Sequence, residues 1–306
     1  MSKKIVFMGT PEFSIDTLET LADSSEKVAC VYTQPPKKSS RGQKINISPV
    51  QKVAENKKIN FRTPENLDTD EEYDYFKKLS PCIVIVVAYG KIIPKQYLDI
   101  KDNIFINIHA SLLPKWRGAA PIQRSIMNCD KETGISIMKI VEKLDAGPFM
   151  KQIKIKIDEQ TNTKNLSKQL SKLGAENILN CINLIKKNEA NFIEQEHSES
   201  TYAKKIKKSE SKIIWQENAK NILAKINGLN PFPGAWFEYN GARYKIWKAG
   251  ISNLQGKPGE ILDEKITIAC KDLSIKIIEI QKEGKNRMTL DNFLSGEKIS
   301  KKIIIH

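Results

Sequence analysis

The sequence lacks the cysteine patterns that mark disulfide frameworks and zinc modules. Its 306 residues include five cysteines, which are scattered along the chain with no Cys-x-x-Cys pair and no clustering with histidine. This spacing argues against a secreted fold held by disulfides and against a zinc site. Reduced thiols in a cytosolic protein are the economical interpretation.

Long apolar runs are also absent. The longest run, residues 83–88, is far too short to span a membrane. The first residues contain only a short apolar run before Gly9 and Pro11, which predicts a first strand and not a signal peptide. We therefore expect a cytoplasmic protein without a membrane partner.

Acidic residues are fewer than basic ones, and the net charge is +14. Residues 206–306 carry 18 basic and 11 acidic side chains, whereas residues 1–205 carry 32 and 25. The excess of +7 is the same in both parts, so the last third has about twice the charge density. This pattern indicates a polyanionic partner such as nucleic acid. A general bias toward Lys, Ile and Asn along the whole chain explains it equally well.

The apolar segments 4–8, 28–32, 83–88 and 105–108 predict strands, and the stretches between them have helical spacing. Thr10 followed by Pro11 predicts the cap and first position of a helix. Strands alternating with helices predict an α/β fold with a Rossmann-like, doubly wound sheet, whose ligands bind at the carboxyl ends of the strands. The first loop has no Gly-x-Gly-x-x-Gly fingerprint, so a dinucleotide is disfavoured.

The pattern changes after a predicted helix at residues 163–187. Residues 188–211 are polar and predict a linker, and a short helix at 219–226 follows. Short strands are then expected at 235–239, 242–248, 259–263, 265–270 and 273–281, which favours a small, OB-like β-barrel. The expected organisation is a catalytic domain at 1–187, a linker at 188–211 and a C-terminal barrel domain at 212–306.

The segment 105–123, FINIHASLLPKWRGAAPIQ, is the most informative part of the chain. Because side chains alternate along a strand, Asn107 and His109 share one face while Ile106 and Ile108 share the other. An amide and an imidazole at a strand end suit an oxyanion donor and a proton carrier. An isolated Asn-x-His pair is also consistent with an inert, buried polar pair.

The motif Asn107-x-His109 followed by residues 111–114 resembles the signature of formyltransferases that use 10-formyltetrahydrofolate. The longer match through residues 116–122 resembles the methionyl-tRNA formyltransferase branch, and the resemblance extends over essentially the whole chain. It implies transfer of the formyl group from 10-formyltetrahydrofolate to the α-amine of methionyl initiator tRNA, with no metal required.

The resemblance also implies roles for particular residues. Asp145, which by itself is typical of a turn, resembles the catalytic aspartate that orients His109 and sets its tautomer. Asn107 donates to the oxyanion. Contacts to the folate are implied for Ser111, Leu112, Leu113 and Pro114, and for Tyr89, Gly90 and Ile92 in a second loop.

Residues 34–49 form a basic loop that resembles the tRNA-clasping insertion of this branch. Arg41 matches the arginine expected to enter the acceptor stem, with Lys37, Lys38 and Lys44 around it. In the barrel domain, Lys285 and Arg287 lie in an expected hairpin loop and are predicted to meet phosphates, although a solvated turn would look the same. Asn227 and Ile214 depart from the family pattern.

Two other functions remain open at this point. One is formyl transfer to a small acceptor, such as an amino sugar nucleotide or glycinamide ribonucleotide, which would need neither basic region. The other is a nucleic-acid-binding protein on an inactive formyltransferase fold, since fold alone does not establish activity. We expect a monomer, and we expect His197 and His306 to be solvated.

Overall fold

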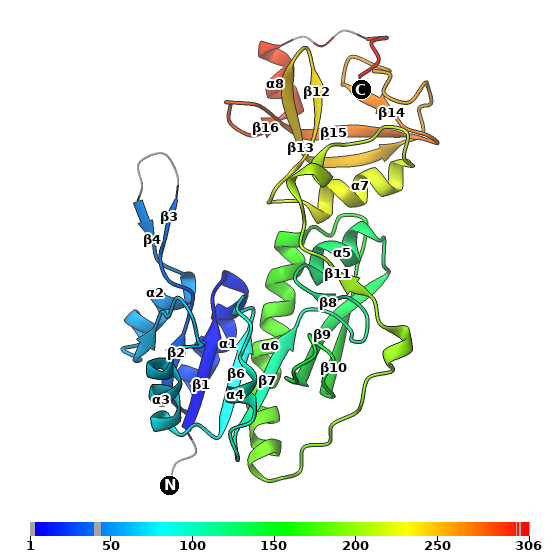
Figure 1. Cartoon of the computed structure of the whole chain (residues 1–306). Helices are drawn as coiled ribbons and strands as arrows, with labels where there is room; N and C mark the ends of the chain where they lie inside the picture. Colours follow the sequence, from blue (N-terminus) through cyan, green and yellow to red (C-terminus); the bar gives the residue numbers. More distant parts are fainter. Residues whose placement is uncertain (1–3, 40–43, 298, 300, 306) are drawn as a thin grey trace. The chain divides into compact units, whose positions relative to one another are not determined.

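The computed structural model describes residues 4–39, 44–297, 299 and 301–305 (Figure 1). The chain divides into two units, each made of several segments. The first unit comprises Met1–Gly118, Gly134–Lys154 and Ser167–Tyr202, and the second comprises Ala119–Thr133, Ile155–Leu166 and Ala203–His306. The domain boundaries expected near residues 187 and 211 stay predictions. Each unit is described by itself below.

The first unit is built on a seven-stranded sheet with the order β10-β9-β7-β6-β1-β2-β5. The strands are β1 (Lys4–Gly9), β2 (Lys27–Tyr32), β5 (Phe61–Arg62), β6 (Ile83–Val87), β7 (Ile104–His109), β9 (Glu132–Lys139) and β10 (Phe149–Lys156). Strands β1, β2, β5, β6 and β7 pair in parallel, and β9 runs antiparallel to β7. The expected Rossmann-like α/β architecture is confirmed.

The helices of this unit are α1 (Ile15–Ala22), α2 (Pro49–Asn56), α3 (Asp70–Leu79), α4 (Lys95–Leu98) and α6 (Thr163–Lys186), which extends into both units. Local sequence explains two starts: the Ser48 hydroxyl accepts from the Gln51 N–H, and the Thr69 hydroxyl accepts from the Glu72 N–H.

The expected cap at Thr10 is wrong. A 3-10 turn, η1 (Glu12–Ser14), precedes α1, and the Thr10 hydroxyl donates to the Tyr89 carbonyl at 2.8 Å. The Thr10 hydroxyl, which the local sequence predicted to cap the helix, is instead bonded to the Tyr89 carbonyl, 79 residues away in the sequence.

The two faces of β7 differ as the alternation of side chains predicts. Phe105 packs in a buried cluster with Val84, Val86 and Phe76, and its ring stacks on that of Phe76. Ile108 faces α6, where a side chain at Gly174 would begin at 3.0 Å from an Ile108 methyl group. The strand is therefore held firmly on both sides, which fixes the direction of the polar side chains near its end.

Short elements complete the first unit. A hairpin is formed by β3 (Lys37–Ser39) and β4 (Lys44–Asn46). Strand β8 (Arg117–Gly118) follows the 111–116 loop, β11 (Tyr202–Ala203) ends the unit, and η2 (His197–Glu199) lies just before β11. The Arg117 N–H donates to the Thr201 carbonyl at 2.9 Å. The segment predicted as a linker is thus hydrogen-bonded to the loop that follows β7.

The second unit contains a curved antiparallel sheet with the order β12-β13-β15-β14, and β16 pairs with β15. Its strands are β12 (Ala235–Tyr239), β13 (Ala242–Ser252), β14 (Thr267–Ala269), β15 (Ser274–Lys282) and β16 (Met288–Thr289), and its helices are α5 (Pro121–Met127), η3 (Lys208–Ser211), α7 (Ala219–Gly228) and α8 (Leu290–Gly296). Register shifts between Ile246 and Ala249 bend β13.

The C-terminal β domain is therefore as expected, with one exception. Residues 259–263 form isolated bridges, Glu260 to Ile304 and Ile261 to Ile268, in place of the predicted strand. Gly259 has φ +89°, and a side chain there would meet the Ile305 carbonyl at 2.3 Å. The turn at Gly259 and this close backbone approach interrupt the regular ladder.

Candidate active site

Asn107 lies in the middle of the sheet, between Val86 of β6 and Met138 of β9. Its side chain is half-buried, and within the part of the chain that the structure describes it has no hydrogen-bond partner. A free amide N–H on a rigid strand is available to a ligand oxygen. This is the property that an oxyanion donor requires.

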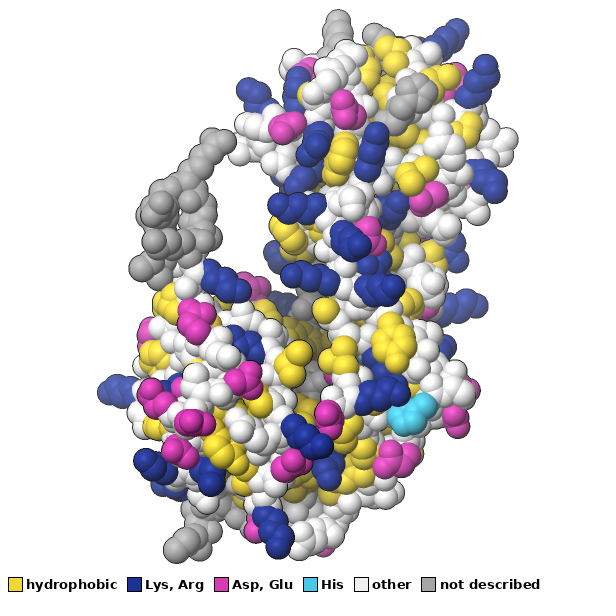
Figure 2. All heavy atoms as spheres, viewed as in Figure 1, with side chains coloured by type: hydrophobic (Ala, Val, Ile, Leu, Met, Phe, Trp, Pro, Cys, Tyr) yellow, Lys and Arg dark blue, Asp and Glu magenta, His cyan; other side chains and the backbone are white. Residues whose placement is uncertain are grey.

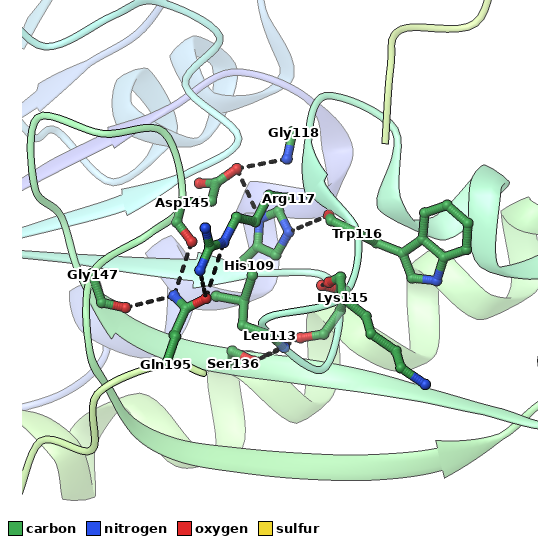
Figure 3. Close-up of polar contacts among 11 residues, drawn as sticks. His109, Leu113, Lys115, Trp116, Arg117, Gly118, Ser136, Asp145, Gly147 and Gln195 are labelled. Atoms are coloured by element: carbon green, nitrogen blue, oxygen red, sulfur yellow. Dashed lines mark hydrogen bonds and ion pairs between the residues drawn. The ribbon is translucent and has the colours of Figure 1, made fainter. Parts of the chain in front are cut away.

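His109 ends β7, and its side chain is 6% exposed. Its Nε2 lies 2.9 Å from the Trp116 carbonyl oxygen (Figure 3). Because a carbonyl can only accept, Nε2 carries the hydrogen, and Nδ1 of the neutral ring has a free lone pair. The hydrogen bond to Trp116 thus places a hydrogen on Nε2, and the role of Asp145 in setting the tautomer stays a prediction.

The backbone of Trp116 explains how its carbonyl reaches the imidazole. Trp116 has φ +62°, which is rare for a bulky residue, and its N–H donates to the Thr201 hydroxyl at 2.9 Å. Left-handed backbone of this kind persists only where the surroundings impose it, and it gathers at functional sites.

Asp145 lies in the loop between β9 and β10 and faces His109 from another element (Figure 3). Its Oδ2 is 3.7 Å from His109 Nδ1 and accepts a hydrogen bond from the Gly118 N–H at 2.8 Å. A proton bound at Nδ1 would thus be stabilised by the neighbouring carboxylate. The structure brings His109 and Asp145 together across 36 residues of sequence, at the carboxyl end of β7.

Two residues that the sequence analysis did not single out hold this loop. The Gln195 amide donates to the Asp145 carbonyl at 2.9 Å and to the Gly147 carbonyl at 2.6 Å. Arg117, only 1% exposed, donates to Gln195 Oε1 through Nε and Nη2. The sequence carried one usable signal for this contact: Gln195 stands between apolar and polar residues in the segment predicted as a linker. No local pattern connects it to Asp145.

His197 is exposed, as expected, and its Nδ1 also accepts a hydrogen bond from Arg117 Nη2 at 2.8 Å. His306 lies outside the described residues.

The loop after His109 is tied by its own hydrogen bonds. Ser111 is fully buried, and its hydroxyl donates to the Lys115 carbonyl at 2.6 Å. The Leu113 N–H donates to Ser136, and the Gln152 amide donates to the Leu113 carbonyl. The Leu113–Pro114 peptide bond is cis. Ser111 and Leu113 thus shape the loop, whereas Leu112 is partly exposed. Contacts of this loop to the folate stay a prediction.

The second predicted folate loop follows β6. Tyr89 is 1% exposed, so its ring belongs to the core, while its carbonyl accepts from Thr10 and from the Gln34 amide. Gly90 has φ +77°, and a side chain there would meet Gln34 at 2.4 Å. Ile92 is 89% exposed and so forms no buried apolar wall in this structure.

The predicted tRNA-contacting residues are placed only in part. Arg41 lies outside the described residues, and Lys38 and Lys44 are described only as backbone of β3 and β4. Lys37 is exposed and donates to Gln34.

In the second unit, Lys285 is exposed in the turn before β16. Arg287 forms an ion pair with Glu279 and lies 5.4 Å from the centre of the Trp247 ring. Lys and Arg side chains are spread over the face of this unit shown in Figure 2.

Metal-ligand clusters and membrane-spanning helices are absent from the described residues. In that part of the chain, no group of three or more His, Cys, Asp or Glu side chains is placed to hold a metal ion. None of the helices described there is long and apolar enough to cross a membrane.

An α/β sheet that presents an amide, an imidazole and a carboxylate at its carboxyl edge defines the class of the formyl-transferring enzymes. The chain belongs to the formyl transferase family: residues 3–182 match the family's formyl transferase model, and residues 205–298 match the model of its C-terminal domain.

Similar proteins support this assignment along the full length. The chain is 54% identical over 303 residues to a methionyl-tRNA formyltransferase of Pelagibacter ubique, covering 98% of each protein. Its fold is similar to a solved methionyl-tRNA formyltransferase from Clostridium thermocellum, with a TM-score of 0.58, 19% identity and coverage of 82% of this chain and 94% of that one. A Helicobacter canadensis N-formyltransferase structure gives a TM-score of 0.68, 19% identity and coverage of 92% and 100%.

Proposed function

We propose that the protein transfers the formyl group of 10-formyltetrahydrofolate to the α-amine of methionine esterified to initiator tRNA. The observation that supports this chemistry is the arrangement of Asn107, His109 and Asp145 at the carboxyl end of β7. The acceptor is supported by the relative that is 54% identical over nearly the whole chain. The product, formylmethionyl-tRNA, serves translation initiation.

The similarity of fold does not choose the acceptor. The Helicobacter canadensis structure was determined with folinic acid and dTDP-3-aminofucose, and its TM-score exceeds that of the Clostridium thermocellum methionyl-tRNA enzyme. Two features of this chain favour tRNA over a sugar nucleotide. One is the basic segment 34–49, and the other is the net charge of +7 on residues 206–306.

In the first half of the reaction, the neutral α-amine attacks the formyl carbon of the folate. A carbon–nitrogen bond forms, and the carbonyl electrons move to the formyl oxygen. The Asn107 amide donates to that oxygen, a kind of interaction whose removal costs about 3 kcal/mol in other enzymes. His109 accepts the amine proton at Nδ1, because Nε2 already donates to Trp116.

In the second half, the tetrahedral intermediate collapses and the bond to N10 of the folate breaks. The proton held at Nδ1 moves to N10, so tetrahydrofolate leaves as a neutral amine. Between the two halves, the Asp145 carboxylate stabilises the imidazolium from 3.7 Å. Overall, one proton moves from the amine to N10, and no covalent enzyme intermediate forms.

The binding residues are proposed on the same basis. The loops after β6 and β7, with Tyr89, Gly90, Ile92 and residues 111–114, would contact the folate. The basic loop around Arg41 and the turn with Lys285 and Arg287 would contact the tRNA. We further propose that the enzyme acts as a monomer in the cytoplasm, which sedimentation of the free protein and its tRNA complex would test.

The direct experiment supplies the protein with 10-formyltetrahydrofolate and three acceptors: methionine-charged initiator tRNA, charged elongator tRNA and free methionine. Formylation of the charged initiator alone is the expected result. Release of tetrahydrofolate without formylmethionine would indicate another acceptor or a hydrolase. No consumption of the folate would favour a nucleic-acid-binding protein.

A further inference from the structure

We infer that Gln195, held by the buried guanidinium of Arg117, is a positioning residue for Asp145. This inference rests on the proposed function, because it assigns a role in formyl transfer. Gln195 lies 50 residues after Asp145, outside every motif of the sequence analysis. Its side chain nevertheless contacts the backbone of the aspartate itself.

The orientation of the Gln195 amide is dictated by its neighbours. Arg117 can only donate, so the oxygen Oε1 must face it, and the two hydrogen bonds are 3.1 Å and 2.6 Å long. The carbonyls of Asp145 and Gly147 can only accept, so the nitrogen Nε2 must face them. Figure 3 shows Gln195 between the guanidinium on one side and the two carbonyls on the other.

Arg117 is 1% exposed, and no carboxylate pairs with it in the part of the chain that the structure describes. Two of its hydrogen bonds go to Gln195 Oε1, and another goes to His197 Nδ1. Charge-assisted hydrogen bonds from a buried cation hold the glutamine amide in one orientation.

Asp145 needs such support, because its own backbone is strained. It has φ +47°, in the left-handed region that residues other than glycine rarely occupy. The next residues offer little freedom, since a side chain at Gly147 would meet the Lys139 carbonyl at 2.0 Å. Gln195 thus fixes a loop whose relaxation would move the carboxylate away from His109 Nδ1. Displacements of about 1 Å in such groups lower rates about 100-fold.

The isosteric variant Gln195→Glu separates positioning from packing. The new carboxylate still accepts from Arg117 and pairs with its charge, but it has no N–H for the two carbonyls. We expect kcat to fall about 10- to 100-fold. We expect the KM values of both substrates to change less than about threefold. The unfolding midpoint in urea should fall modestly, because a carboxylate oxygen then faces two carbonyl oxygens that have lost their donor.

Tyr97→Phe is the matched control in the same unit. It removes a buried 2.8 Å hydrogen bond to the Leu67 carbonyl, which involves none of Asn107, His109, Asp145 and Gln195. We expect it to lower the unfolding midpoint and leave kcat unchanged. If Tyr97→Phe reduced kcat as much as Gln195→Glu does, a general loss of rigidity would explain both, and the positioning role would be wrong.

The Asp145→Ala background tests whether Gln195 acts through the aspartate. Adding Gln195→Glu to Asp145→Ala should lower kcat by less than about twofold, because the group being positioned is gone. A further tenfold loss in that background, or a wild-type kcat for Gln195→Glu alone, would overturn the inference. A wild-type protein that formylates no acceptor would instead refute the proposed function.

Discussion

Buried polar side chains have different roles in the two units. In the first unit, the buried polar residues in and around the loops after β7 include His109, Ser111, Arg117, Ser136 and Gln195. His109, Ser111 and Gln195 hydrogen-bond to backbone carbonyls of neighbouring loop residues. Desolvated and tightly held groups of this kind are suited to stabilising charge that develops during a reaction.

In the second unit, buried polar side chains such as Asn230 and Thr163 join one element to another. The Asn230 amide donates to the Trp247 carbonyl, and the Thr163 hydroxyl donates to the Gly228 carbonyl, each at 2.7 Å. The charged groups lie at the surface: residues 206–306 carry 18 basic side chains against 11 acidic ones. Exposed cations act at long range and are screened by salt.

We therefore expect the two units to contribute differently to the chemical step and to tRNA binding. Substitutions of the buried polar residues around the loops after β7 should act mainly on kcat and be indifferent to salt. Substitutions of surface cations in the second unit should act mainly on the KM for tRNA and on its salt dependence. The predictions below test this difference, beginning with the largest expected effect.

Asn107→Ala should lower kcat about 100- to 1000-fold, because it removes the proposed oxyanion donor. The KM for tRNA should change little, since the half-buried side chain has no described partner and lies in the sheet. Steady-state formylation of charged initiator tRNA measures both constants. Full activity in this variant would remove the proposed mechanism.

The double variant Lys285→Ala/Arg287→Ala should raise the KM for tRNA several-fold and leave kcat unchanged. The slope of log KM against log salt should fall by about one for each phosphate that these side chains neutralise in the wild type. Lys168→Ala/Lys172→Ala, which removes two exposed charges from α6, is the control of equal charge. Equal effects in the two double variants would mean that net charge alone matters.

The ion pair between Arg124 and Glu210 should make the stability of the second unit depend on pH. Its two hydrogen bonds are 2.7 Å and 3.1 Å long, and Arg124 holds the pKa of Glu210 below its ordinary value. A lowered carboxyl pKa contributes stability above the unfolded-state value of about 4.3, and this is lost as pH falls through the folded-state pKa.

Glu210→Gln should therefore destabilise the second unit by about 1 kcal/mol at pH 7, and by less as the pH falls below 4. Urea unfolding followed by tryptophan fluorescence reports mainly this unit, because Trp215, Trp236 and Trp247 lie in it and only Trp116 lies in the first. A difference that stayed constant with pH would show that the ion pair is not its cause.

Ile92→Ser should change the free energy of unfolding by less than about 0.5 kcal/mol, because the side chain is 89% exposed. If Ile92 covers bound folate as proposed, the KM for 10-formyltetrahydrofolate rises a few-fold. Ile278→Ser, at an exposed position of β15 in the second unit, is the control and should leave that KM unchanged. An unchanged KM in Ile92→Ser would exclude Ile92 from the folate site.

Much of the fold was predictable because periodicity is local. The apolar runs predicted β1, β2, β6 and β7 to within a residue or two, and the helical stripe predicted α6, which ends at Lys186. Placing Asn107 and His109 on one face required only the alternation of a strand. The wrong prediction of a cap at Thr10 shows where local patterns fail, because its hydroxyl donates to the distant Tyr89 carbonyl.

Most strands of the first unit, the basic excess and the amide, imidazole and carboxylate of the site could be read from the sequence. Which atoms of these residues are available became clear from the fold. The Trp116 carbonyl accepts from His109 Nε2, and a glutamine from a presumed linker holds Asp145. The physical reason is that hydrogen-bond partners over such separations depend on where whole segments lie once the sheet has formed, and neither periodicity nor composition carries that information.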